Sequence, residues 1–175
     1  MLDDAADGDV AICYICHARI DGTDRFFCWS SGGSTPDYVV VDEQGLVPTS
    51  STEVGARELA ARECHQVSSE PPLVVYDLDE VETWSRSGSE VVACKDVLNL
   101  WNLVSDLPLH SELFAKADED SERLYDKVFM GCNLPSMSSG DVYVPYWSAP
   151  EIKSLKRLLL LGVAEFRSRL KRPEV

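Results

Sequence analysis

Basic residues are scarce in this sequence, and so are long apolar runs. The 175 residues contain 16 Lys and Arg against 30 Asp and Glu, which gives a formal net charge of −14. A field of that sign repels nucleic acid phosphate and anionic lipid, so we expect no nucleic acid partner. No apolar run approaches the ~20 residues of a membrane-spanning helix, so we expect no membrane partner either.

Export signals, repeats and linkers are also missing. The first residues, MLDDAADGDV, lack the basic and apolar regions of a secretory signal, so we expect a cytoplasmic protein. No internal repeat or long Pro- and Gly-rich linker divides the chain. We therefore predict a single domain over residues 1–175, with a flexible N-terminus at residues 1–9.

The charge that is present is unevenly distributed. Residues 1–150 hold 27 acidic and 9 basic side chains, a net charge of −18. Residues 151–175 hold 3 acidic and 7 basic side chains, a net charge of +4. We expect the basic final segment to dock on the acidic surface of its own chain, where cations near a helix C-terminus also suit the helix dipole.

The order of periodic patterns predicts the fold class. The first half carries short β-like segments separated by turn sequences, at residues 10–20, 25–30, 38–42 and 46–47. A helix is predicted from Ser51, with Val54, Leu59, Ala60 and Cys64 near one stripe, and PPLVVYD then reads as a buried strand. We predict an α+β fold in which an antiparallel N-terminal hairpin or meander packs with a mainly helical C-terminal half around one shared core. The β-rich part with its one helix covers residues 10–78 and the helical part covers residues 79–175.

Helical periodicity dominates the second half. A short helix is predicted in DEVETWSR, and a longer one over residues 89–107 has Val91, Cys94, Leu98, Trp101 and Val104 in register. Residues 111–130 predict a further helix, followed by a long irregular segment. Ser148 and Glu151 form a capping box with Pro150 inside the first turn, which predicts a last helix to about Arg172.

The stretch CYICHARIDGTDRFFC, residues 13–28, contains side chains of the kinds that bind metals. Cys13, Cys16 and Cys28 could bind zinc if a fourth ligand came from His17, Cys64 or His65. Its C-x-x-C-H start also matches covalent haem attachment, which normally follows export and is therefore disfavoured here. In a reducing compartment we expect the six cysteines to be free thiols or metal ligands rather than disulfides.

A plain β-hairpin is the competing interpretation of this stretch. If DGTD closes a hairpin with a two- or four-residue loop, alternation places Cys13 and Cys28 on one face of the sheet and Cys16 on the other. Ile15, His17 and Phe26 share the first face, whereas Ile12, Tyr14, Phe27 and Trp29 share the second. The hairpin is favoured, so we expect no cofactor and keep zinc as the alternative.

A second motif lies in LVVYDLDEVETW, residues 73–84. A strand ending in D-x-D resembles the first motif of the haloacid dehalogenase-like phosphatases. The resemblance implies a Mg²⁺-dependent phosphatase with Asp77 as nucleophile and Asp79 as general acid/base. That family usually continues with Gly-Thr or Gly-Val, whereas this chain has Glu80-Val81. The alternative is structural: Asp79 as a helix N-cap, with Glu82 completing a capping box.

Aromatic residues in the irregular segment before the last helix suggest recognition. Tyr143, Tyr146 and Trp147, with Asn133 and Met137 nearby, are typical of a protein-binding surface, although they could instead cover the core. No complete catalytic constellation is visible, so we expect a protein without enzymatic activity. We predict a protein-binding domain of inhibitor or immunity type that captures a basic protein, such as a bacterial toxin, by electrostatic steering. The sequence carries no signal for an oligomeric state.

Overall fold

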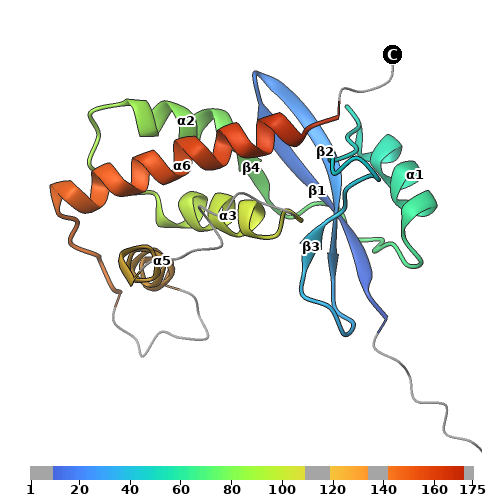
Figure 1. The fold of residues 1–175 in the computed structure, drawn as a ribbon, viewed down its shortest axis with the longest axis horizontal. Coiled ribbons are helices and arrows are strands. Elements are labelled where there is room, and N and C mark those ends of the chain that lie inside the picture. The colour runs from blue at the N-terminus through green and yellow to red at the C-terminus, as the bar shows by residue number, and fades with distance from the viewer. Residues whose placement is uncertain (1–9, 109–118, 134–141, 172–175) are drawn as a thin grey trace, which may run out of the picture.

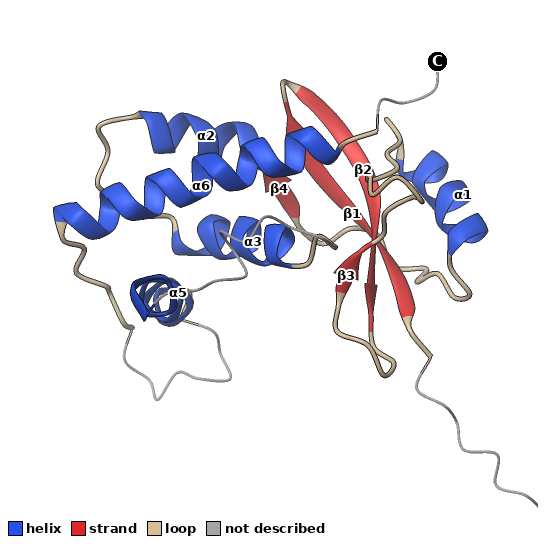
Figure 2. Cartoon of the chain, viewed as in Figure 1, coloured by secondary structure: helices blue, strands red, loops and turns tan. Residues whose placement is uncertain are grey.

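The computed structural model describes residues 10–108, 119–133 and 142–171. Its elements follow one another as β1 (Ile12–Ile20), β2 (Thr23–Ser31), β3 (Tyr38–Val39), α1 (Glu53–Glu63), β4 (Val75–Asp77), α2 (Leu78–Arg86), α3 (Cys94–Ser105), α5 (Glu119–Gly131) and α6 (Ala149–Arg169). The predicted α+β class is confirmed, with strands in the first half and mostly helices in the second (Figure 2).

The sheet is mixed and is covered on both faces. Its strand order is β3-β2-β1-β4, in which β1, β2 and β3 are antiparallel neighbours and β4 pairs parallel to β1. Helix α1 lies on one side of the sheet, whereas α2, α3 and α6 lie on the other (Figure 1). Helix α5 packs on α3, farther from the strands.

The β1–β2 hairpin has the predicted register. Asp21 and Gly22 both have positive φ, at 54° and 66°, as the two central residues of a type I′ turn require. Cys13 lies opposite Ser30 and Cys16 lies opposite Phe27. Because strand side chains alternate, Cys13 and Cys28 face α1 while Cys16 faces the larger helical layer.

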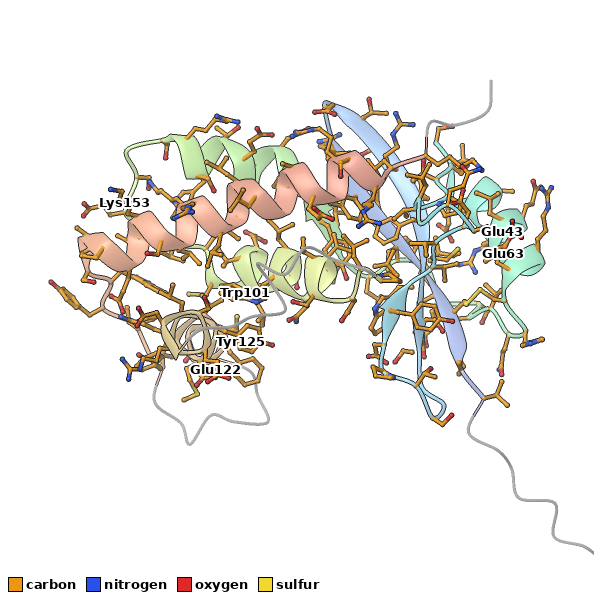
Figure 3. All side chains as sticks on the ribbon, in the orientation of Figure 1. Glu43, Glu63, Trp101, Glu122, Tyr125 and Lys153 are labelled. Atoms are coloured by element: carbon orange, nitrogen blue, oxygen red, sulfur yellow. A yellow bond between two sulfur atoms is a disulfide. The ribbon has the colours of Figure 1, made fainter. Side chains whose placement is uncertain are left out.

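A single large cluster of buried residues joins the sheet to the helices. Phe27 of β2 and Phe166 of α6 are both 0% exposed, and their rings meet edge to face at 5.5 Å. Trp101 of α3 packs on Tyr125 of α5 with ring centroids 5.5 Å apart (labelled in Figure 3). On the opposite face, a smaller cluster packs Ala56 and Ala60 of α1 against the sheet.

Asp79 has a structural role different from the one predicted. The N-cap of α2 is Asp77, whose carboxylate accepts the backbone N–H of Glu80 at 2.9 Å, so the prediction of Asp79 as N-cap is wrong. The Asp79 carboxylate instead accepts the backbone N–H groups of Asp21 (2.7 Å) and Gly22 (2.8 Å). It therefore fastens the hairpin turn to α2, a long-range contact that local capping rules do not reveal.

Three residues expected in the interior lie at the surface. Val54 is 68% exposed because α1 faces the sheet with Ala56 and with Ala60, of which only Ala60 belonged to the predicted stripe. Val91 is 80% exposed because α3 begins only at Cys94. Val75 is 50% exposed because β4 is an edge strand, so the prediction of a buried strand there is wrong.

The last helix begins as predicted and its C-terminal half pairs with acidic residues. The Ser148–Glu151 capping box is present and Pro150 lies in the first turn. The Arg167 guanidinium lies 3.0 Å from Asp21 and 2.6 Å from Glu82. These ion pairs join α6 to α2 and to the hairpin turn, which is the docking expected for the basic end of the chain.

No helix in the described ranges combines the length and the apolar character that crossing a bilayer requires.

Candidate functional site

The segment at residues 142–147 is held in place by one side chain. Asn133 follows α5 with a φ of 48°, a left-handed conformation that Asn adopts more readily than most residues. Its Oδ1 accepts the backbone N–H of Tyr143 at 2.7 Å, and its Nδ2 donates to the Tyr143 carbonyl at 2.9 Å. Asn133 thus satisfies both backbone groups of Tyr143, much as a neighbouring strand would.

A close approach to α5 fixes the same segment a second time. A Cβ added at Gly131 would lie 2.8 Å from Cγ of Pro145 and 2.6 Å from Sγ of Cys94. The absence of a side chain at Gly131 therefore lets the segment and the start of α3 pack on the end of α5.

The two valines and two tyrosines of this segment are exposed, whereas Pro145 and Trp147 are half-buried. The exposed fractions are 76% for Val142, 43% for Tyr143, 80% for Val144 and 84% for Tyr146. Neighbouring exposed apolar side chains of this kind mark interaction sites more often than single exposed ones do. The structure thus brings together Asn133, Tyr143 and Tyr146, three residues that the sequence suggested for protein binding.

Trp147 packs the end of the segment against the core. It is half-buried against the core, and the Lys127 ammonium lies 4.8 Å from the centre of its ring. Lys127 also pairs with Glu151 at 2.7 Å. The hydrogen bond from Lys127, followed by those from Ser148, lowers the pKa of Glu151 to about 2. Met137, the remaining residue of the predicted surface, lies outside the described residues.

A polar cavity of about 400 Å³, which no sequence pattern predicts, lies between the sheet and α3. Its walls are Cys16, Trp29, Asp37, Tyr76, Asn99, Asn102, Leu103 and Asp106. These residues come from distant parts of the chain, so no local motif could have identified them. A weak signal exists only in the N-L-W-N stretch of α3, which carries both amides.

The chemistry of this cavity suits a cationic group. It offers the carboxylates of Asp37 and Asp106 and two side-chain amides, and no Lys or Arg of the described ranges lines it. The indole N–H of Trp29 donates to Oδ2 of Asp106 at 3.0 Å, which orients that carboxylate. Burial is the main cause that raises the pKa of Tyr76, so its phenol stays neutral.

The three cysteines of the predicted zinc site do not lie together. Cys13 forms a disulfide with Cys64 at the end of α1, so the expectation of free thiols is wrong for these two residues. Cys28 lies on the same face as Cys13, and Cys16 lies on the opposite face. In the described part of the chain, no three His, Cys, Asp or Glu side chains form a group that could hold a metal. Zinc binding stays a prediction, which elemental analysis of protein purified without added metal tests.

The remaining thiols of the hairpin are poor ligands and nucleophiles as they stand. Burial, with a smaller contribution from Cys28, raises the pKa of Cys16 to about 12. Burial also raises the pKa of Cys28 to about 11. Because the thiolate is the reactive and metal-binding form, both sulfurs are protonated near neutral pH.

The two aspartates of the D-x-D motif are both occupied in backbone contacts. Asp77 caps α2 and Asp79 holds the hairpin turn, as described above. The phosphatase function itself stays a prediction, and substitution of Asp77 by Asn tests it if any phosphatase activity is measured.

Comparison with models of known protein families, with curated proteins and with solved structures finds no match to this chain.

Proposed function

We propose that this protein is a non-enzymatic protein-binding domain of inhibitor or immunity type that captures a basic protein. The observation that carries the proposal is the apolar segment at residues 142–147, whose exposed tyrosines sit on a backbone fixed by Asn133. Tyrosine is enriched among the residues that dominate binding energy at protein interfaces. A backbone already fixed before binding loses less conformational freedom in the complex, which favours affinity.

Charge complementarity supports a basic partner. A net charge of −14 attracts a cationic protein over distances of about 10 Å at moderate ionic strength and accelerates encounter. The cavity beside Asp37 and Asp106 has acceptors for one lysine or arginine side chain of such a partner.

A capture experiment with three immobilised baits tests the proposal. The baits are the wild type, the double variant Tyr143→Ala/Tyr146→Ala, and the matched control Val54→Ala/Leu73→Ala. The control removes apolar side chains that are 68% and 84% exposed but lie away from the segment. We expect mass spectrometry to identify a protein of high isoelectric point on the wild-type and control baits that is lost from the tyrosine variant.

Two outcomes contradict the proposal. The first is a set of captured proteins that the tyrosine substitutions leave unchanged, including an empty set on all three baits. The second is a tyrosine-dependent partner that is acidic, because the charge argument then has the wrong sign.

A further inference from the structure

A groove between the end of α2 and the first half of α6 combines an apolar floor with a basic rim. Its volume is about 530 Å³, within the usual range of small-molecule sites. Ile152, Leu160 and Leu161 supply apolar surface, and Lys153, Lys156 and Arg157 lie along the same stretch of α6. Figure 3 labels Lys153 on the side of α6 that faces α2.

The cations of this groove differ from the other basic residues of α6. Arg167 pairs with Asp21 and Glu82, as described above. Lys153 and Arg157 are exposed, and neither side chain has an ion pair or hydrogen bond in the described part of the chain. They lie four residues apart on one helix face, so one anion can approach both.

Lys156 forms the edge of the groove on the α2 side. Its ammonium donates to the carbonyls of Ser87 (2.7 Å) and Ser89 (2.8 Å) and lies 4.9 Å from the centre of the Trp84 ring. These contacts fix a positive charge at the groove whether or not a ligand is present. Among the lining residues only Glu90 carries an opposing charge.

A buried hydroxyl in the wall lacks a partner. Ser85 lines the groove and is 6% exposed, and its Oγ has no hydrogen-bond partner in the described structure. Buried polar groups are nearly always hydrogen-bonded, so this hydroxyl is an exception in the wall of the groove. Because its Oγ is closed to solvent, it does not itself face a ligand in the groove, and the case for a ligand rests on the basic rim and the apolar floor.

We propose that this groove binds a single-chain carboxylate amphiphile of the fatty-acid class. The carboxylate would lie near Lys153 and Arg157, and the alkyl chain would cover the apolar floor. The positive charge of the groove disfavours a cationic amphiphile and gives a neutral one no ion pair. A small hydrophilic anion would leave the apolar floor uncovered, so it is disfavoured as well. This site is separate in chemistry from the proposed partner surface, which attracts cations.

Titration with sodium dodecanoate below its micelle concentration tests the proposal, with binding followed by calorimetry and by amide chemical shifts. We expect saturable binding, with shift changes concentrated at residues 85–90 and 149–161. The variant Lys153→Glu/Arg157→Glu should bind at least about tenfold more weakly. Its matched control, Arg62→Glu/Lys95→Glu, makes the same change in net charge at exposed cations elsewhere and should bind within about twofold of the wild type.

A third variant and two other ligands test the details. Ser85→Ala removes only a buried hydroxyl that does not face the groove, so we expect a folded protein with affinity within about twofold of the wild type. Acetate, which lacks the chain, and dodecyltrimethylammonium, which reverses the charge, should both fail to saturate the groove. The proposal is overturned if dodecanoate does not bind, if its shift changes lie elsewhere, or if the reversed-charge variant binds as well as its control. Failure here leaves the proposed function untouched, since the tyrosine variants test that separately.

Discussion

Substitution of Asn133 tests how the segment at residues 142–147 is held. The side chain makes hydrogen bonds of 2.7 and 2.9 Å with the two backbone groups of Tyr143 and a third of 3.1 Å with the Gly131 carbonyl. A hydrogen bond of this kind contributes about 1 kcal/mol net, and partial exposure lets water replace part of it. We expect Asn133→Gly to loosen the segment by about 1–2 kcal/mol.

The positive φ of Asn133 makes a second contribution to how firmly the segment is held, and the variant Asn133→Ala measures it. With φ at 48°, Asn133 occupies a region that costs a residue with a Cβ about 1–2 kcal/mol unless a short polar side chain compensates. Asn133→Ala should therefore destabilise the segment by about 1 kcal/mol more than Asn133→Gly. The order of the two variants distinguishes lost hydrogen bonds from backbone strain.

Amide hydrogen exchange reports the effect directly. The Tyr143 amide loses its acceptor in Asn133→Gly, so its exchange should accelerate about tenfold, since about 1.4 kcal/mol corresponds to a factor of ten. The Ile152 amide, which donates to the Ser148 carbonyl at 3.0 Å, is the internal control and should keep its rate. Unchanged exchange at Tyr143 in Asn133→Gly would refute the argument that Asn133 holds the segment.

Three further substitutions address the fold that supports the segment. Cys64→Ser removes a disulfide across a sequence separation of 51, so the free energy of unfolding should fall by about 4 kcal/mol under non-reducing conditions. Glu151→Gln should cost about 1 kcal/mol at pH 7 by weakening the capping box. The hydrogen bond from Lys127 is the main cause that lowers the pKa of Glu151 in the folded state to about 2. The wild type should therefore lose this stability as the pH falls from about 4.5 to 2, because the carboxylate is then protonated. Glu151→Gln has no carboxylate to protonate and should not show this loss. Gly131→Ala places a Cβ 2.6 Å from Sγ of Cys94 and should destabilise by about 1–3 kcal/mol.

Urea denaturation measures the free energy of unfolding of all three variants, and a different result would contradict each prediction. Equal stability of Cys64→Ser and oxidised wild type means that the disulfide does not constrain the unfolded chain. Parallel pH profiles for Glu151→Gln and wild type between pH 4.5 and 2 contradict the lowered pKa of Glu151. A neutral Gly131→Ala means that the end of α5 has room for a methyl group.

Local signals in the sequence were enough to place the hairpin and the last helix. The Asp21-Gly22 turn determines the register of β1 and β2 because both residues tolerate positive φ. The Ser148–Glu151 capping box likewise involves residues three apart, so the start of α6 needs no knowledge of the rest of the fold.

Contacts between distant segments could not be predicted in the same way. The Cys13–Cys64 disulfide depends on α1 crossing the hairpin face, and the expectation of a reducing compartment pointed away from it. The role of Asp79 depends on the hairpin turn meeting α2. The cavity beside Asp37 and Asp106 gathers residues from both halves of the chain, and no single sequence motif spans them.

The affinity of the purified protein for its captured basic partner tests the central claim most directly. Calorimetry at moderate ionic strength should show that Tyr143→Ala/Tyr146→Ala raises Kd at least about thirtyfold, which corresponds to the 2 kcal/mol that defines a binding hot spot. The matched control Val54→Ala/Leu73→Ala should stay within about twofold of the wild type. Equal Kd values for the two double variants would contradict the account, because the segment held by Asn133 would then contribute nothing particular to recognition.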